Sequence, residues 1–110
     1  MEKHIFIVFT NAKDGQEAEF NDWYTNRHVG DVLKIPGIVS ATRYELSDFQ
    51  RPTPHPWKYM AIYEIETDDL KSVSDEISRR AGTPLMIRSD AMAPEIETHF
   101  YAPMQSAVSE

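Results

Sequence analysis

His28 is the residue whose type and position best suit chemistry in this sequence. Phe20, Tyr24 and His28 recur at every fourth position, the spacing that stacks side chains on one helix face. An imidazole with an ordinary pKa of about 6.5 can take or give a proton at neutral pH. Asp31 follows three residues later, and its carboxylate would hold the ring in one tautomer if the helix continues. We predict His28, Asp31 and Tyr24 as catalytic residues; the alternative is that His28 only caps the helix C-terminus.

Further candidates lie on segments that alternate like β-strands. Polar and aromatic side chains share these segments with apolar residues of the opposite parity, which suggests a face that meets a ligand. The predicted substrate contacts are Phe6, Arg43, Tyr59, His99 and Tyr101. Each has a simpler alternative, because a strand histidine is often exposed or satisfied and a strand tyrosine often only packs.

No cofactor or metal is predicted. The four histidines, His4, His28, His55 and His99, show no spacing typical of metal ligands. The chain has no cysteine, so thiolate chemistry, disulfides and cysteine-bound metals are excluded. It also lacks a phosphate-binding loop, a dinucleotide fingerprint and a nucleophile elbow.

Length and charge limit the classes of protein to which the chain belongs. Its 110 residues suit a single domain over 1–110, with a loose tail over 103–110. The net charge of −7 argues against nucleic acid and anionic membrane as partners. There is no secretory signal or membrane-spanning stretch, and with no cysteine we expect a cytoplasmic protein.

Periodicity and turn residues predict two helices and four strands. The first helix begins with Asp14 as N-cap and Glu17 three residues later, and ends or changes shape near Val29-Gly30, with a further turn over 31–35. The second helix has Thr67 as its cap and Arg79-Arg80 at its end, and Gly82 fits the C′ position that follows. The strands are expected at 4–10, 38–47, 57–66 and 95–102. A stiff loop with three prolines spans 48–56, and 83–94 is irregular.

The resulting order, βαββαβ, predicts an α+β, ferredoxin-like fold. Two right-handed crossovers give a four-stranded antiparallel sheet with both helices on one face. The other face has no cover within the chain, although the strands carry apolar residues at both parities. Since exposed apolar faces mark interfaces, we expect a homodimer formed sheet against sheet, and a pocket for a small molecule.

The segment from Phe20 to Tyr44 resembles the dimeric α/β-barrel superfamily, most closely its EthD-like group. The resemblance rests on Phe20–His28, Asp31–Leu33, the Pro36-Gly37-Ile38 step into a strand, and Arg43-Tyr44. Gly30 departs from the family pattern, which often has proline two residues after the histidine. The resemblance implies a dimer whose two sheets form a barrel. Its members include cofactor-free monooxygenases, polyketide cyclases, lactone isomerases, dehydratases, decarboxylases and haem-degrading enzymes.

These observations together lead to a functional hypothesis. The chain is expected to be a cofactor-independent enzyme of the EthD-like type that performs acid/base chemistry, as a lyase, isomerase or cyclase. Its substrate would be small, oxygenated and aromatic or polyketide-like. The alternatives are a cofactor-free or haem-type monooxygenase, and a non-catalytic, stress-associated dimer that binds a small ligand. The fold itself does not choose among them.

Overall fold

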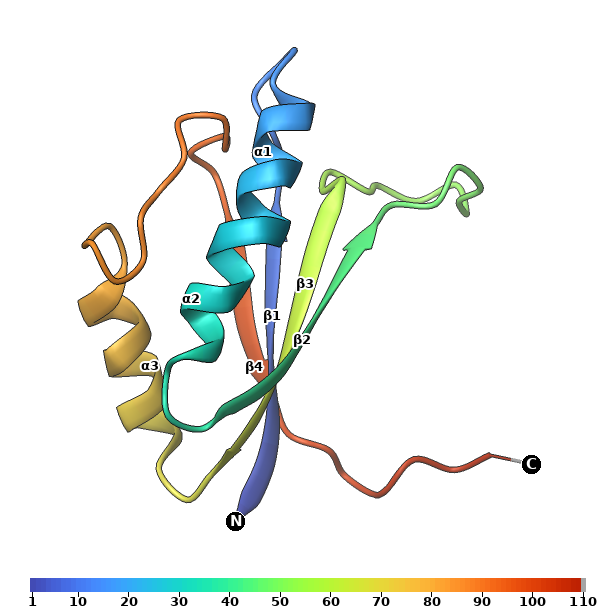
Figure 1. Ribbon diagram of the computed structural model, residues 1–110. Helices are drawn as coiled ribbons and strands as arrows, with labels where there is room; N and C mark the ends of the chain where they lie inside the picture. The colour runs from blue at the N-terminus through green and yellow to red at the C-terminus, as the bar shows by residue number, and fades with distance from the viewer. Residues whose placement is uncertain (110) are drawn as a thin grey trace.

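A computed structural model describes residues 1–109 and has α+β architecture (Figure 1). Four strands form one antiparallel sheet in the order β2-β3-β1-β4. The elements along the chain are β1 (Glu2–Thr10), α1 (Glu17–Trp23), the π-helical turn η1 (Tyr24–His28), α2 (Val29–Leu33), β2 (Ile38–Glu45), β3 (Tyr59–Thr67), α3 (Leu70–Arg80) and β4 (Glu97–Tyr101). Because α1, η1 and α2 form one continuous helical segment, the order confirms the predicted ferredoxin-like βαββαβ fold.

The helices cover one face of the sheet, and the core lies between them (Figure 1). Phe6 on β1 pairs with Tyr63 on β3, and both side chains are buried against the helices. Strand residues point to alternate faces, so every second residue of these strands belongs to this helix-covered face. The helices contribute Phe20, Tyr24, Val32 and Val73 to the same core.

A β-bulge in β2 overturns the alternation expected over 38–47. The register shifts between Ile38, which pairs with Ile65, and Ser40, which pairs with Glu64. Val39 is therefore the extra residue, and it is exposed. After the bulge Arg43 shares the helix-covered face with Ile38, although residues five apart in a regular strand lie on opposite faces.

The first helical segment follows one of the two predicted alternatives, a change of shape followed by a further turn. It does not end at Val29-Gly30, because α2 continues to Leu33. The change of shape occurs earlier, in the π-helical turn over Tyr24–His28. Such a turn takes in an extra residue and is often found at functional sites.

Both predicted helix N-caps are wrong. The first helix begins after Gln16, with no side-chain cap, and Glu17 instead accepts a hydrogen bond from the Tyr59 hydroxyl. The second helix is capped by Asp69, whose carboxylate accepts from the Ser72 backbone N–H at 3.1 Å. Thr67 accepts from the Asp69 backbone N–H, so it stabilises the turn that precedes the helix.

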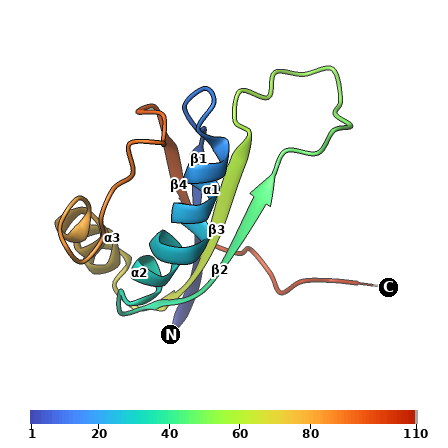
Figure 2. The ribbon, with the colours of Figure 1, turned by 45° about the horizontal axis from the view of Figure 1, so that its top comes forward.

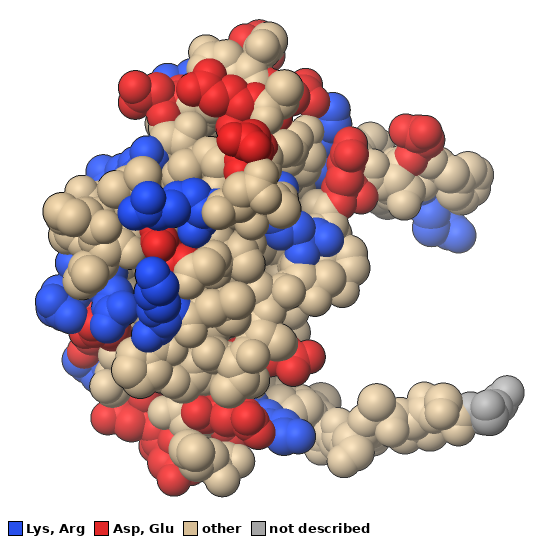
Figure 3. All heavy atoms as spheres, in the orientation of Figure 1, with Lys and Arg blue, Asp and Glu red and all other residues tan. Residues whose placement is uncertain are grey.

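The other face of the sheet has no helix over it, and we call it the open face. It presents half-buried Ile5, Ile7 and Ile62, with exposed Tyr44 and Tyr101 beside them. The β2–β3 connection swings away from the body, as Figure 2 shows. In Figure 3 this loop and the tail after β4 project on the same side of the molecule.

Candidate functional site

A cavity of about 640 Å³ lies between the helix-covered face of the sheet and the helices. Its floor comes from β1, β3 and β4, and its walls come from the first helical segment, α3 and the segment 81–96. The side chains that define it are largely aromatic, aliphatic or sulfur-containing: Phe6, Val8, Trp23, Tyr24, Val32, Tyr63, Ile77, Met86, Met92, Ile96 and Phe100. A mostly apolar pocket with a few polar groups is the usual form of a small-molecule site.

The π-helical turn sets the position of His28 in this cavity. The imidazole stacks on Trp23 with ring centroids 4.6 Å apart and meets Tyr24 edge-on at 4.8 Å. Trp23 and His28 are five residues apart, which is one turn of a π-helix rather than of an α-helix. The wide turn therefore encloses the imidazole between two aromatic rings at the wall of the cavity.

Burial makes His28 a neutral base. It lowers the pKa of His28 to about 4, although the nearby Asp31 carboxylate opposes the shift by raising the pKa. The Nδ1 atom is buried and has no hydrogen-bond partner within the described residues. At neutral pH the ring is thus uncharged, with a polar atom that nothing in this part of the chain satisfies.

Asp31 is buried, but its partner is Arg27 and not His28. Its carboxylate accepts a hydrogen bond from the Arg27 Nε at 2.9 Å. The predicted contact in which Asp31 holds the imidazole is not formed. Asp31 acts on His28 through its charge alone, by favouring the protonated ring.

Tyr24 lies beside His28 and is hydrogen-bonded to a second buried tyrosine, Tyr63. The Tyr63 hydroxyl donates to the Tyr24 hydroxyl at 3.2 Å. Burial raises the pKa of both phenols above the usual value, so both stay protonated. Because Tyr24 accepts from Tyr63, its own hydroxyl hydrogen is left to donate to another oxygen.

Arg43 and Tyr59 lie behind this wall and do not line the cavity. The Arg43 guanidinium sits 4.3 Å from the centre of the Tyr24 ring and donates to the Thr25 hydroxyl. The Tyr59 hydroxyl bonds Glu17 and Asn21. Both residues therefore support Tyr24 and the helix instead of meeting a ligand directly.

His99 and Tyr101 lie on the open face, across the sheet from the cavity. Their strand neighbours Thr98 and Phe100 point into the cavity instead. His99 is 3.0 Å from the Glu97 carboxylate on the same strand. Of the predicted site, the structure brings together Phe6, Tyr24 and His28, but not these two residues.

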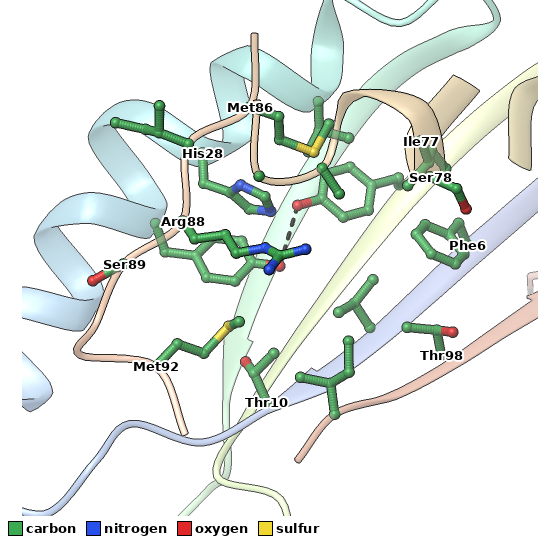
Figure 4. Close-up of a pocket in the computed structure, with 18 of the residues that line it drawn as sticks. Phe6, Thr10, His28, Ile77, Ser78, Met86, Arg88, Ser89, Met92 and Thr98 are labelled. Atoms are coloured by element: carbon green, nitrogen blue, oxygen red, sulfur yellow. Dashed lines mark hydrogen bonds between the residues drawn. The ribbon is translucent and has the colours of Figure 1, made fainter. Parts of the chain in front are cut away.

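Sequence reasoning missed the wall formed by 81–96, which Figure 4 shows beside His28. This segment carries Met86, Arg88 and Met92 to the cavity. It is anchored by buried Ala91, whose carbonyl accepts from the Lys13 backbone N–H at 2.8 Å. Its apolar residues, spread along an irregular stretch, were the available signal that it covers something.

Within residues 1–109, no three His, Asp or Glu side chains gather closely enough to hold a metal ion. None of the helices in that range is long and apolar enough to cross a membrane.

Comparison with known sequences finds one short match. No family model matches the chain. A segment of 51 residues, 46% of the chain, is 42% identical to core atranone cluster protein 1 of Stachybotrys chlorohalonatus. The chain covers only 20% of that protein, about a fifth of its length.

Comparison with solved structures finds the same fold in proteins of low sequence identity. SnoaB, a cofactor-independent oxygenase from Streptomyces nogalater, superposes with a TM-score of 0.60 at 15% identity, over 96% of this chain and 97% of its own. An EthD family protein from Bacillus halodurans gives 0.54 at 16% identity, over 94% and 100%. These likenesses confirm the ferredoxin-like fold that the resemblance implies.

Proposed function

We propose that this protein is a cofactor-independent enzyme that moves a proton on a small, oxygenated, aromatic or polyketide-like substrate. The observation that carries the proposal is the neutral His28 imidazole at the wall of an aromatic cavity, whose Nδ1 has no hydrogen-bond partner in residues 1–109, beside a tyrosine hydroxyl free to donate. The reaction class is that of a lyase, isomerase or cyclase. The comparison with SnoaB makes a cofactor-free oxygenase the second candidate, and the experiment below separates the two.

The proposed step begins with His28 as general base. The imidazole takes a proton from a carbon next to a substrate carbonyl. The C–H electron pair becomes the C=C bond of an enolate, and the π pair of the C=O bond moves onto the oxygen. The Tyr24 hydroxyl donates a hydrogen bond to that oxygen. A protonated imidazole is costly in this cavity by itself, but it is favoured once a negative oxygen forms beside it. Proton return to a different atom completes an isomerisation, and loss of a leaving group completes an elimination.

We also propose that the working unit is a homodimer joined through the open face. Ile7 and Ile62 pair at the centre of that face, and both are only half-buried in the single chain. A second copy would cover them, and the cavity lies on the opposite side of the sheet, so dimerisation leaves it open. The loop and tail that project on one side in Figure 3 would flank the partner.

Deuterium exchange tests the proposed chemistry without knowledge of the product. Hydroxyaromatic ketones and short polyketide mimics are incubated with the protein in heavy water, and loss of the signal of the hydrogen next to the carbonyl is followed by NMR. Wild-type protein should accelerate the exchange, and His28→Gln should lower the rate at least a hundredfold, as expected for loss of a general base. His55→Gln is the matched control, because His55 is exposed and lies far from the cavity in the proline-rich loop.

The outcomes separate the candidates. Exchange at equal rates in wild type and His28→Gln would remove His28 from the mechanism. Oxygen uptake with the same compounds, lost in His28→Gln, would favour the oxygenase. Binding of the compounds with neither exchange nor oxygen uptake would leave a non-catalytic ligand-binding protein.

A further inference from the structure

Among the side chains of residues 1–109 that line the cavity, Arg88 is the one with a permanent charge. No Asp, Glu or Lys lines it, within the described part of the chain, although the protein has 18 acidic residues and a net charge of −7. His28, the other titratable nitrogen base there, is neutral at pH 7. The electrostatic character of the cavity is thus opposite to that of the whole protein.

The backbone on both sides of Arg88 is fixed. Met86 is buried, and its carbonyl accepts from the Gly82 backbone N–H at 2.9 Å. Ala91 is fully buried and is bonded to the loop after β1. The backbone of Arg88 is therefore held on both sides by these hydrogen bonds. This limits how far the Arg88 side chain can move away from the cavity.

The guanidinium is packed against Gly82. A Cβ atom on that glycine would lie 3.0 Å from the Arg88 Cζ and Nε atoms, so a side chain there would push the guanidinium from this position by a few tenths of an ångström. Figure 4 shows Arg88 extended into the cavity, on the side where His28 also points inward. The missing side chain at Gly82 thus makes room for this orientation.

No carboxylate neutralises Arg88 within residues 1–109. Other arginines of the chain do have such partners: Arg27 pairs with Asp31, and Arg79 and Arg80 pair with Glu76. Arg88 is an exposed residue, and its donors form no hydrogen bond with another side chain in that range. A guanidinium in this state can bind an oxygen anion with two parallel N–H donors.

We propose that Arg88 is a specificity-determining residue that selects aromatic ligands carrying a negatively charged oxygen, of the phenolate, enolate or carboxylate class. This inference rests on the proposed function and deepens it. Arg88 would bind the charged oxygen while the aromatic wall binds the rings. The same contact would stabilise the enolate formed when the neutral imidazole takes its proton.

Two chromogenic probes test the charge preference without turnover. Para-nitrophenol ionises near neutral pH and its phenolate is visible, whereas para-nitroanisole has the same ring and cannot ionise. The affinity of wild-type protein for each probe is measured by spectral titration, and the pKa of bound para-nitrophenol is read from its absorbance against pH. The variants are Arg88→Gln, Arg88→Lys and, as matched control, Arg51→Gln, an exposed arginine in the proline-rich loop.

We expect wild type to bind the phenolate about tenfold more tightly than the neutral phenol, which lowers the pKa of the bound probe by about one unit. Arg88→Gln should abolish this preference and leave para-nitroanisole binding unchanged, Arg88→Lys should retain part of it, and Arg51→Gln should behave as wild type. Equal preference in wild type and Arg88→Gln would overturn the inference, and so would failure of wild type to bind either probe. Because neither readout needs catalysis, a failure of the His28 chemistry appears separately, in the deuterium exchange.

Discussion

The rings of Trp23 and His28 stack with an interplanar angle of 25°, although five residues separate them in the chain. The stack shields the imidazole from water, and this burial is the main cause of its low pKa. The Trp23 Nε1 atom is itself buried without a partner in the described residues. The indole therefore contributes to the site through its ring face.

Removing that ring face should return the imidazole towards ordinary behaviour. In Trp23→Ala, water reaches the ring and the pKa of His28 should rise from about 4 towards 6.5. Trp23→Phe keeps an aromatic face and should shift the pKa much less. NMR titration of the imidazole hydrogens measures both; a pKa that stays near 4 in Trp23→Ala would show that the indole is not the shield.

The low pKa of His28 also predicts how stability depends on pH. An unfolded histidine takes up its proton at about pH 6.5, but the folded protein holds His28 neutral down to about pH 4. The unfolded state thus binds more protons in this window. The free energy of unfolding should therefore fall as the pH drops from about 6.5 to 4, with His28 contributing up to about 3 kcal/mol.

Denaturant unfolding at fixed protein concentration measures this loss. His28→Gln should flatten the slope between those pH values, and His55→Gln, at an exposed position, should leave it intact. Identical slopes in wild type and His28→Gln would mean that the imidazole titrates alike in both states.

The two hydroxyls of the tyrosine pair should differ in importance for activity. Tyr24→Phe removes the hydrogen that we assign to the substrate oxygen and should lower kcat about a hundredfold. Tyr63→Phe removes only the donor behind it and should cost about 1 kcal/mol of stability, with a smaller effect on kcat. Equal losses of kcat in the two variants would argue that neither hydroxyl touches the substrate.

Gly82 and Gly15 form a matched pair for testing the position of Arg88. Their φ angles are +78° and +76°, so alanine at either position should cost about 1–2 kcal/mol through the same backbone strain. Only at Gly82 does the new Cβ meet Arg88, whereas at Gly15 it meets open space. Gly82→Ala should therefore weaken the phenolate preference, and Gly15→Ala should keep it at equal stability. A preference retained in both would show that Arg88 reaches the anion from elsewhere.

The open face should control the oligomeric state. Ile62→Glu places a charge at its centre and should convert a dimer into monomers in light scattering at micromolar concentration. Leu85→Glu adds the same charge at an exposed site off the sheet and should not. A wild-type protein that is monomeric under these conditions would refute the proposed dimer.

The fold could be predicted from sequence because it follows from local patterns. The alternation of the strands, the apolar stripe of α3 and the Pro36-Gly37 stop each depend on residues that are close together in the chain. The strand period of two and the helix period of 3.6 can therefore be recognised in the sequence. The same patterns pointed to Phe6, Tyr24 and His28. Local patterns do not reveal a single inserted residue. The extra residue Val39 reversed which side chains of β2 face the helices, and the π-helical turn stacked His28 on Trp23.

What only the tertiary structure decided is which groups meet across the chain. His99 and Tyr101 lie on the open face because β4 pairs with β1 in a register that points Phe100 inward. Asp31 bonds Arg27 because the helix continues past Gly30, and Arg88 reaches the cavity because an irregular segment is anchored to the loop after β1. These contacts join residues far apart in sequence or depend on one register choice, so no local periodicity encodes them.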